Sequence, residues 1–346
     1  MTIYIVFWII ILLMVFFELK IDVVVCEKVR FKSKKISFFV IYIFSILVGI
    51  FRNEFLGVDV LNYRSHFYSL RQVGLLDSLK YGDSDWGFFL FSKIISLFTE
   101  EYNTYKAVLY IITFTIVAVI IYKQSRYPAI SFMVYFGLGF WGYNFCILRQ
   151  ALAISICFWG FKFAKDRQLI RFIICVIVAT LIHSTAIIFI IIYPIINTKI
   201  NGISMTKRFA LMIIAYVFGK LGLPFVYHFF HTDYSTFIIQ NQGMAKLIML
   251  LCIIMFIQLL IVNIPFSKKE EYDAAFISVY TQIVSLFFSL FTRMTQYFIL
   301  FLVLVVPEVC EKKKNTLVNL IFVFIFTIMY FLMLDGMSIV PYVSIF

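Results

Sequence analysis

Long apolar runs separated by short, lysine-rich segments constrain this sequence more than any other feature. The runs at 3–19, 105–122 and 316–334 each have about 17 to 19 residues, enough for a helix to cross the hydrocarbon core of a bilayer. Of the 346 residues, 63% are hydrophobic and only 14% are charged, which excludes an ordinary soluble domain. We therefore predict an all-α, polytopic membrane bundle that forms a single transmembrane domain over residues 1–346.

The basic residues decide how two ambiguous runs are placed. The run at 86–98 is short for a span, and the run at 172–196 is too long for one untilted span and too short for two. If each crossed once, the basic clusters at 123–126 and 162–171 would lie outside. If both fail to cross fully, or cross twice, every lysine-rich loop lies in the cytoplasm, as the positive-inside rule requires. We therefore predict about ten full spans, with 86–98 dipping or interfacial and 172–196 a cytoplasmic hairpin whose tip lies near His183.

This topology places Arg52, Arg149 and Arg293, none of which is in a lysine-rich loop, at the outer face. The longest polar segment, 52–85, mixes charged and aromatic residues and is predicted to form a folded external cap. Arg149 is the most informative of the three, because apolar runs precede and follow it. A guanidinium at membrane depth is costly unless it is paired or reaches water. The alternative interpretation is a short loop whose arginine reaches the headgroups.

Arginines gathered at one face, without a metal-ligand cluster, indicate an anionic ligand. Guanidinium groups bind phosphate oxygens in a bidentate way and can neutralise a diphosphate leaving group without a metal ion, so we expect no metal and no cofactor. Arg293, Gln296 and Tyr297 have the spacing that places them on one helix face. Asp59 and Tyr63 would do the same if that part of the cap is helical, although Asp59 could equally be an ordinary loop carboxylate.

Two other patterns have more ordinary interpretations. His183 is a lone histidine in an apolar run, where packing is the usual role, but its place in mid-run favours a function. The Asp83, Ser84 and Asp85 triplet has a carboxylate spacing by which many nucleotide-sugar transferases hold a metal. Because it precedes a helical run, we predict instead that Ser84 and Asp85 cap that helix. The net charge of +12 sits largely in short loops and does not indicate nucleic-acid binding.

Taken together, these stretches resemble the EpsG family, a branch of the Wzy-like polysaccharide polymerases, in family order along nearly the whole chain. The matching residues are Arg52, Gly57-Val58-Asp59, Tyr63, Asp85-Trp86-Gly87-Phe88, Leu148-Arg149-Gln150-Ala151, Ala153, His183-Ser184, Arg293, Tyr297-Phe298 and Pro341-Tyr342. The family pattern usually has threonine before the first aspartate and glutamate before the Trp-Gly-Phe run. This chain has Val58 and Asp85 at those positions, which leaves the role of that part of the cap open.

The resemblance implies a glycosyltransferase with a GT-C-like helical fold in the bacterial cytoplasmic membrane. Such proteins join oligosaccharide repeat units carried on undecaprenyl diphosphate at the outer, periplasmic face, which lengthens an O-antigen, capsule or exopolysaccharide. The expected reaction is a direct displacement at the anomeric carbon with inversion. The expected partners are the lipid-linked donor and acceptor and the bilayer, with no nucleic acid. Whether a chain-length regulator takes part stays open.

On this reading, Arg149 and Arg293 grip the donor diphosphate, and Arg52 helps them or orients the cap. Asp59 is the expected group that orients or deprotonates the acceptor hydroxyl, because it is the carboxylate nearest the cluster. The expected supporting contacts are Tyr63, Gln150, His183, Gln296 and Tyr297.

Two other functions remain as alternatives. A transporter or flippase of lipid-linked sugars would need acidic residues in mid-span or two related halves, and the sequence shows neither. In a membrane O-acyltransferase, His183 would be catalytic and a reactive acyl donor would arrive from inside.

Overall fold

The protein is helical throughout the part of the chain that the structure, a computed structural model, describes. That part comprises residues 1–24, 27–81, 85–197, 204–222, 244–261 and 267–345, and its one departure from helix and loop is an isolated β-bridge between Arg52 and Ser344. Among these residues, five helical stretches are long and apolar enough to cross a membrane, and several shorter apolar helices accompany them. The prediction of an all-α integral membrane protein is confirmed.

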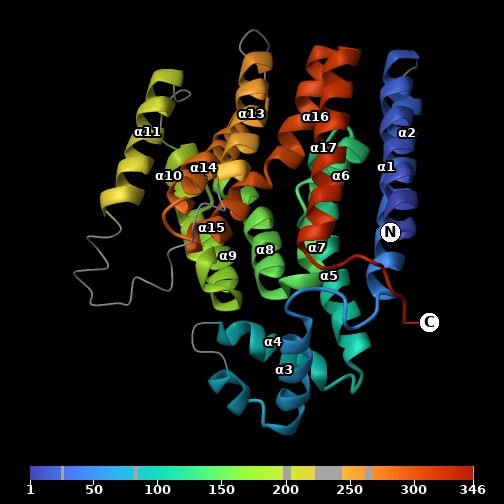
Figure 1. Ribbon diagram of the computed structural model, residues 1–346, viewed down its shortest axis with the longest axis vertical. Coiled ribbons are helices and arrows are strands. Elements are labelled where there is room, and N and C mark those ends of the chain that lie inside the picture. The colour runs from blue at the N-terminus through green and yellow to red at the C-terminus, as the bar shows by residue number, and fades with distance from the viewer. Residues whose placement is uncertain (25–26, 82–84, 198–203, 223–243, 262–266, 346) are drawn as a thin grey trace.

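The elements follow one another along the chain as coloured in Figure 1. They are α1 (Thr2–Val24), α2 (Glu27–Ile50), α3 (Val60–Gln72), η1 (Asp77–Lys80), α4 (Trp86–Ser96), α5 (Tyr102–Gln124), α6 (Pro128–Gly137), α7 (Phe140–Cys146), α8 (Leu148–Lys165), α9 (Leu169–Ile182), η2 (Ser184–Ile191), α10 (Ile192–Asn197), α11 (Met205–Val217), η3 (Phe218–Gly222), α13 (Met244–Ile261), α14 (Lys269–Ser285), α15 (Leu290–Ile299), α16 (Leu302–Lys313) and α17 (Thr316–Gly336).

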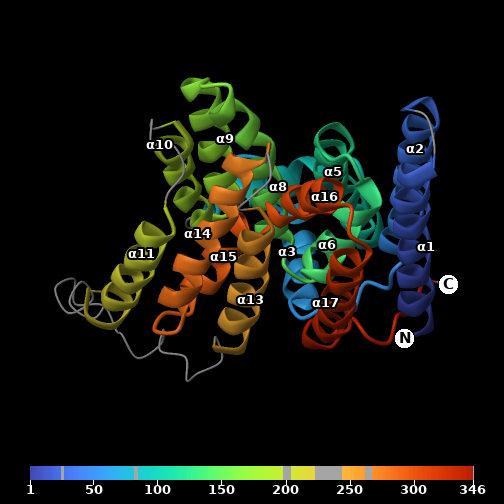
Figure 2. The ribbon, with the colours of Figure 1, turned by 90° about the horizontal axis from the view of Figure 1, so that it is seen from above.

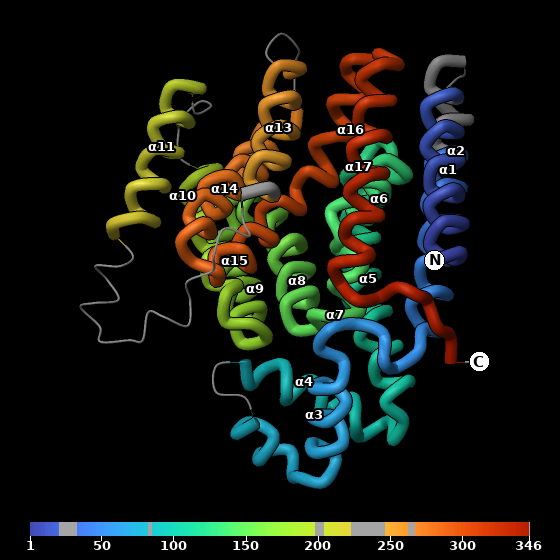
Figure 3. The backbone as a smooth tube through the Cα atoms, viewed as in Figure 1, coloured from blue at the N-terminus to red at the C-terminus, as the bar shows by residue number. Residues whose placement is uncertain are grey.

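The cap is a layer of short helices at one end of the bundle. Figure 3 shows α3 and α4 below the longer helices, and Figure 2 shows α1 and α2 at one edge of the bundle and α11 at the other. Aromatic contacts attach the cap to the start of α5, where the ring of Phe67 lies 4.7 Å from that of Tyr105. The described part of the predicted cap, residues 52–81 and 85, is therefore folded onto the bundle together with α4.

The basic loops gather at the end opposite the cap. Polar contacts join them there: Arg126 pairs with Glu311 at 2.9 Å, and Lys34 donates to the Ser125 carbonyl at 2.7 Å. Lys165, the last residue of α8, pairs with Glu271 on α14, also at 2.9 Å. Basic loops on one side and the cap on the other is the arrangement that the positive-inside rule predicts.

Residues 169–197 form a hairpin that begins and ends at this basic end. The α9 helix covers about 21 Å before His183 adopts an extended conformation, with φ −153° and ψ 114°, and η2 and α10 return. Asn197 donates to the Ala164 carbonyl at 2.9 Å, so the end of the segment lies beside the loop where it started. The structure thus agrees with the predicted hairpin whose tip lies at His183.

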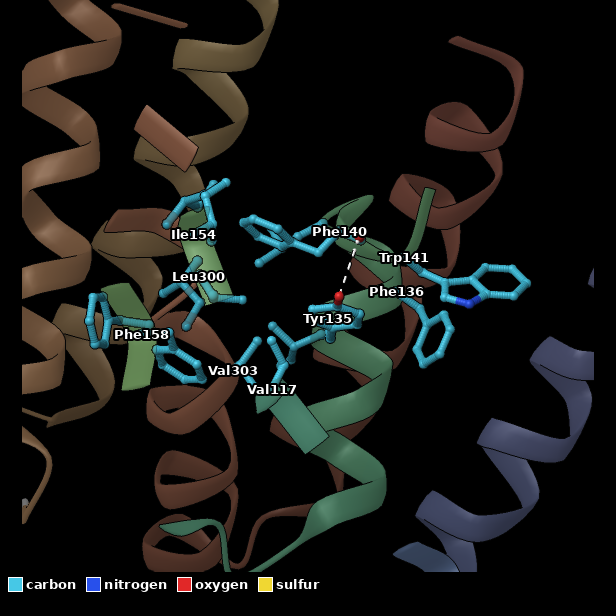
Figure 4. Packing of buried hydrophobic residues seen from close by; sticks show 14 of the residues in the cluster. Val117, Tyr135, Phe136, Phe140, Trp141, Ile154, Phe158, Leu300 and Val303 are labelled. Atoms are coloured by element: carbon cyan, nitrogen blue, oxygen red, sulfur yellow. Dashed lines mark hydrogen bonds between the residues drawn. The ribbon is translucent and has the colours of Figure 1, made fainter. Parts of the chain in front are cut away.

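A break between α6 and α7 sets where α8 begins. The α6 helix ends at Gly137, and Gly139 has φ +82°, a left-handed conformation that glycine adopts without a steric penalty. Around the break, aromatic side chains fill the core, as Figure 4 shows, and the Tyr135 hydroxyl donates to the Phe140 carbonyl at 3.4 Å. The short α7 then leads directly into α8, which places Arg149 in the first turn of that helix.

Candidate functional site

The carboxylate of Asp85 joins three segments that are distant in the sequence. Its Oδ2 lies 3.0 Å from Nη1 of Arg149 on α8 and 3.1 Å from Nδ1 of His183 at the hairpin tip. Its Oδ1 accepts a hydrogen bond of 2.9 Å from the backbone N–H of Ser184. The residue just before α4 is therefore tied to both α8 and the hairpin.

The prediction that the Asp85 side chain caps α4 is wrong. Asp85 occupies the N-cap position, but its side chain makes no capping hydrogen bond. The carboxylate is turned instead toward the guanidinium of Arg149 and the imidazole of His183. The other two members of the triplet, Asp83 and Ser84, lie outside the described residues.

These contacts keep Asp85 ionised. Burial alone raises the pKa of its carboxyl group, but the hydrogen bonds from His183 and Ser184, together with the Arg149 charge, outweigh burial and hold that pKa below its usual value. An ionised carboxylate can only accept hydrogen bonds, so we assign the proton of His183 to Nδ1. The lone pair is then on Nε2, which is buried and has no hydrogen-bond partner among the described residues.

Arg149 keeps donors available for a ligand. Its side chain is 38% exposed, and Asp85 engages one of its terminal nitrogens, whereas a guanidinium carries five N–H donors. The rings of Tyr63 and Phe89 lie 5.9 Å from its central carbon, so the cap holds the group from one side. Burial raises the pKa of Tyr63 more than Arg149 lowers it, and the phenol therefore stays a neutral donor.

Arg293 lies beside the first turn of α8. The side chain of Gln150 donates to the Arg293 carbonyl at 2.9 Å, which joins α8 to α15. The Arg293 side chain is exposed, and its guanidinium has no ion pair or hydrogen bond within the described part of the chain. One turn after Arg293, the Tyr297 hydroxyl lies 3.2 Å from that of Thr185 on η2. The side chain of Gln296, the residue before Tyr297, is partly exposed.

Arg52 is at the same end of the molecule but in different surroundings. It is only 2% exposed, and its guanidinium stacks 4.3 Å from the ring of Phe145 at the end of α7. Its Nε and Nη1 have no partner among the described residues, and Lys106 donates to its carbonyl. The Gln150 contact places the Arg293 backbone beside the helical turn that carries Arg149, and the structure does not bring Arg52 into contact with Asp85.

Asp59 is placed near Tyr63 rather than near His183. It precedes α3 without capping it, is partly exposed, and accepts a backbone hydrogen bond of 3.3 Å from Tyr63 through its carbonyl. Its carboxylate makes no ion pair with any of the described arginines. As for metals, the described residues contain no group of three or more histidines, cysteines or carboxylates that could hold an ion.

Comparison with known protein families identifies the family of this chain. A model of the EpsG family matches residues 35–344. The chain belongs to the EpsG family. No curated protein and no solved structure matches it. The resemblance seen in the sequence is thereby confirmed, and membership indicates a membrane protein of exopolysaccharide biosynthesis.

Sequence reasoning missed the role of Asp85 in this EpsG-family protein. The residue is 64 positions from Arg149 and 98 from His183, so no local spacing connects it to either of them. The signal that could have found it is its position at the start of the Trp-Gly-Phe run. An acid at the start of an apolar helix is compatible with both capping and pairing.

Proposed function

We propose that this EpsG-family protein is a metal-independent polysaccharide polymerase. It would transfer a growing glycan from undecaprenyl diphosphate to a hydroxyl group of another lipid-linked repeat unit, at the outer face of the bacterial cytoplasmic membrane. The observation that supports this most is the shared carboxylate: Asp85 contacts both a histidine that can accept a proton and an arginine that can bind a diphosphate.

The proposed reaction is one displacement. The acceptor oxygen attacks the anomeric carbon of the donor sugar, its new bond to carbon forms, and the bond from that carbon to the phosphate oxygen breaks. The electron pair of the broken bond goes to the diphosphate, whose charge Arg149 and Arg293 neutralise. The hydroxyl proton goes to Nε2 of His183, the nitrogen left with a lone pair when Nδ1–H points at Asp85. Attack from the side opposite the leaving group gives inversion.

His183 is better placed for this proton transfer than Asp59, the base that the sequence suggested. A base needs a partner that fixes its tautomer and orientation, and Asp85 supplies that for His183. The Asp59 carboxylate has no such partner among the described residues. Asp59 keeps a proposed role in orienting the acceptor, while Arg52, Tyr63, Gln150, Gln296 and Tyr297 are proposed to support substrate binding from the same end.

The arrangement of helices also supports the proposal. The cap, Arg149 and Arg293 lie opposite the basic loops, and the positive-inside rule assigns basic loops to the cytoplasm, which supports a candidate site at the outer face. We propose about ten full spans and a GT-C-like bundle, in which the hairpin reaches the site from the inner side.

The deciding experiment is polymerisation in vitro. Purified protein is given undecaprenyl-diphosphate-linked repeat units, and the products are sized by gel. We expect a ladder from the wild type and none from Arg149→Ala. The matched control is Arg126→Ala, because Arg126 is 42% exposed and also paired to a carboxylate, but at the basic end. Folded wild type that makes no longer product contradicts the proposed function, and acyl transfer in its place supports the O-acyltransferase alternative.

A further inference from the structure

A cavity of about 500 Å³ lies at the basic end of the molecule, opposite the candidate site. It is bounded mainly by α1 on one side and by α16 and α17 on the other. Its volume falls within the range of small-molecule binding pockets, which is about 300–1,000 Å³. None of the residues discussed for glycan transfer lines it.

The cavity lies between α1 and α17, which contact each other toward the cap and leave a space toward the basic end. Near the cap, the Trp8 ring stacks on Tyr330 with centroids 4.3 Å apart, and its Nε1 donates to the Thr327 hydroxyl at 3.1 Å. Toward the basic end, Phe16 on α1 and Leu320 on α17 are 48% and 47% exposed, and both line the cavity. The space between the helices is thus an apolar wedge.

Two lysines stand at the charged end of this wedge. Lys20 ends the apolar part of α1, and Lys314 follows α16 with φ +46°. Both are exposed, and neither ammonium group has a hydrogen bond or an ion pair within the described part of the chain. The wedge therefore combines an apolar interior with a positively charged mouth.

The described carboxylates around the wedge are already engaged, so they do not account for the two lysines. Glu18, two residues before Lys20 on α1, is buried and accepts hydrogen bonds from the Ala129 N–H at 3.1 and 3.2 Å. Glu311 on α16 pairs with Arg126, and Glu308 accepts from Ser267 at 2.6 Å. Among the described side chains, none of these carboxylates therefore competes with an external anion for Lys20 and Lys314.

We propose that this wedge binds one anionic phospholipid from the leaflet at the basic end. The phosphate lies between Lys20 and Lys314, and an acyl chain packs between Phe16 and Leu320. Clustered basic residues at the membrane surface attract anionic headgroups, and pockets of this kind between helices bind them. The walls require a long apolar group, which a free phosphate lacks.

A lipid fits this volume better than a helix of a second protein does. A helix about 10 Å across has a cross-section of roughly 80 Å², so a cavity of about 500 Å³ holds little more than one helical turn. A flexible acyl chain can follow a narrow wedge that a helix cannot enter. The inference does not depend on the reaction proposed above.

Native mass spectrometry of the delipidated full-length chain tests the headgroup contact. The protein is titrated in detergent with phosphatidylglycerol or with phosphatidylcholine of the same acyl chains. We expect one saturable phosphatidylglycerol per chain and weaker binding of phosphatidylcholine. Lys20→Ala combined with Lys314→Ala should weaken phosphatidylglycerol binding about 30-fold. Lys312→Ala combined with Lys313→Ala removes equal charge from residues that do not line the wedge, and this control should bind as the wild type does.

A second pair of variants tests the apolar wall without changing charge. Leu320→Trp fills the wedge and should abolish the bound lipid, whereas Leu317→Trp, on the same helix but outside the wedge, should not. Equal binding of the two lipids by the wild type overturns the proposal. An equal loss of phosphatidylglycerol binding in the two lysine double variants would also overturn it. So would wild-type binding by Leu320→Trp, or a protein dimer that forms in place of the complex with lipid.

Discussion

Nδ1 of His183 lies 3.1 Å from Oδ2 of Asp85, although 98 residues separate the two along the chain. This contact joins the tip of a hairpin to the start of a cap helix, at the end of the molecule where Arg149 and Arg293 also lie. It makes His183 an oriented imidazole with one nitrogen available as a proton acceptor.

Replacing His183 with glutamine should lower kcat for polymerisation by about 10² to 10⁴-fold, because an amide cannot accept the hydroxyl proton. KM for the lipid-linked donor should change little, since Arg149 and Arg293 remain. The matched control is His66→Gln, which alters an exposed histidine of the cap. Steady-state kinetics on both variants give the answer. Equal losses of kcat in the two variants would argue against a specific role for His183.

Arg149→Lys keeps the positive charge but loses the planar, forked donor group. We expect kcat/KM to fall about 10 to 100-fold, because the lysine cannot contact Asp85 and two phosphate oxygens at once. Arg126→Lys, at the opposite end, should leave kcat/KM unchanged. Full activity of Arg149→Lys would show that only the charge at this position matters.

Gly87→Ala should separate α4 from the hairpin. A Cβ atom at Gly87 would lie 2.7 Å from the Leu181 carbonyl oxygen, and that backbone atom cannot rotate away. We expect a loss of about 1–3 kcal/mol in stability and reduced polymerisation, because Asp85, two residues earlier, moves with α4. The matched control is Gly336→Ala, where the new Cβ has no neighbour within 4 Å. Thermal unfolding and the gel assay report the two effects separately.

The stability of the protein should fall in acid partly through Asp85. Because the folded-state pKa of this carboxyl group lies below its ordinary value of 3.8, its stabilisation is fully present above about pH 4. It is lost as the pH falls through the folded-state pKa. Asp85→Asn should lower the melting temperature at neutral pH and show a shallower decline in acid. Parallel melting curves for the two proteins between neutral pH and about pH 3 would contradict this assignment.

The helical bundle and the hairpin could be predicted from the sequence, because both follow from the lengths of the apolar runs and the positions of the basic residues. The run at 172–196 fits neither one span nor two, and only a break near His183 keeps the basic loops on one side. The contacts of Asp85 with Arg149 and His183 could not be predicted. An acidic residue before an apolar helix has the same local sequence whether it caps that helix or pairs with a distant side chain. The surroundings of Arg52 depend on Phe145, 93 positions further on, and on Ser344.

The hairpin has one more consequence. The hairpin starts and finishes at the basic end, and its two legs meet at the tip, so the chain does not run directly from His183 to the cap. Noncovalent contacts alone hold the tip, and shifting either leg along its axis would carry the imidazole with it. A displacement of either leg at the basic end would therefore move the histidine out of register with Asp85 without any change in the cap itself.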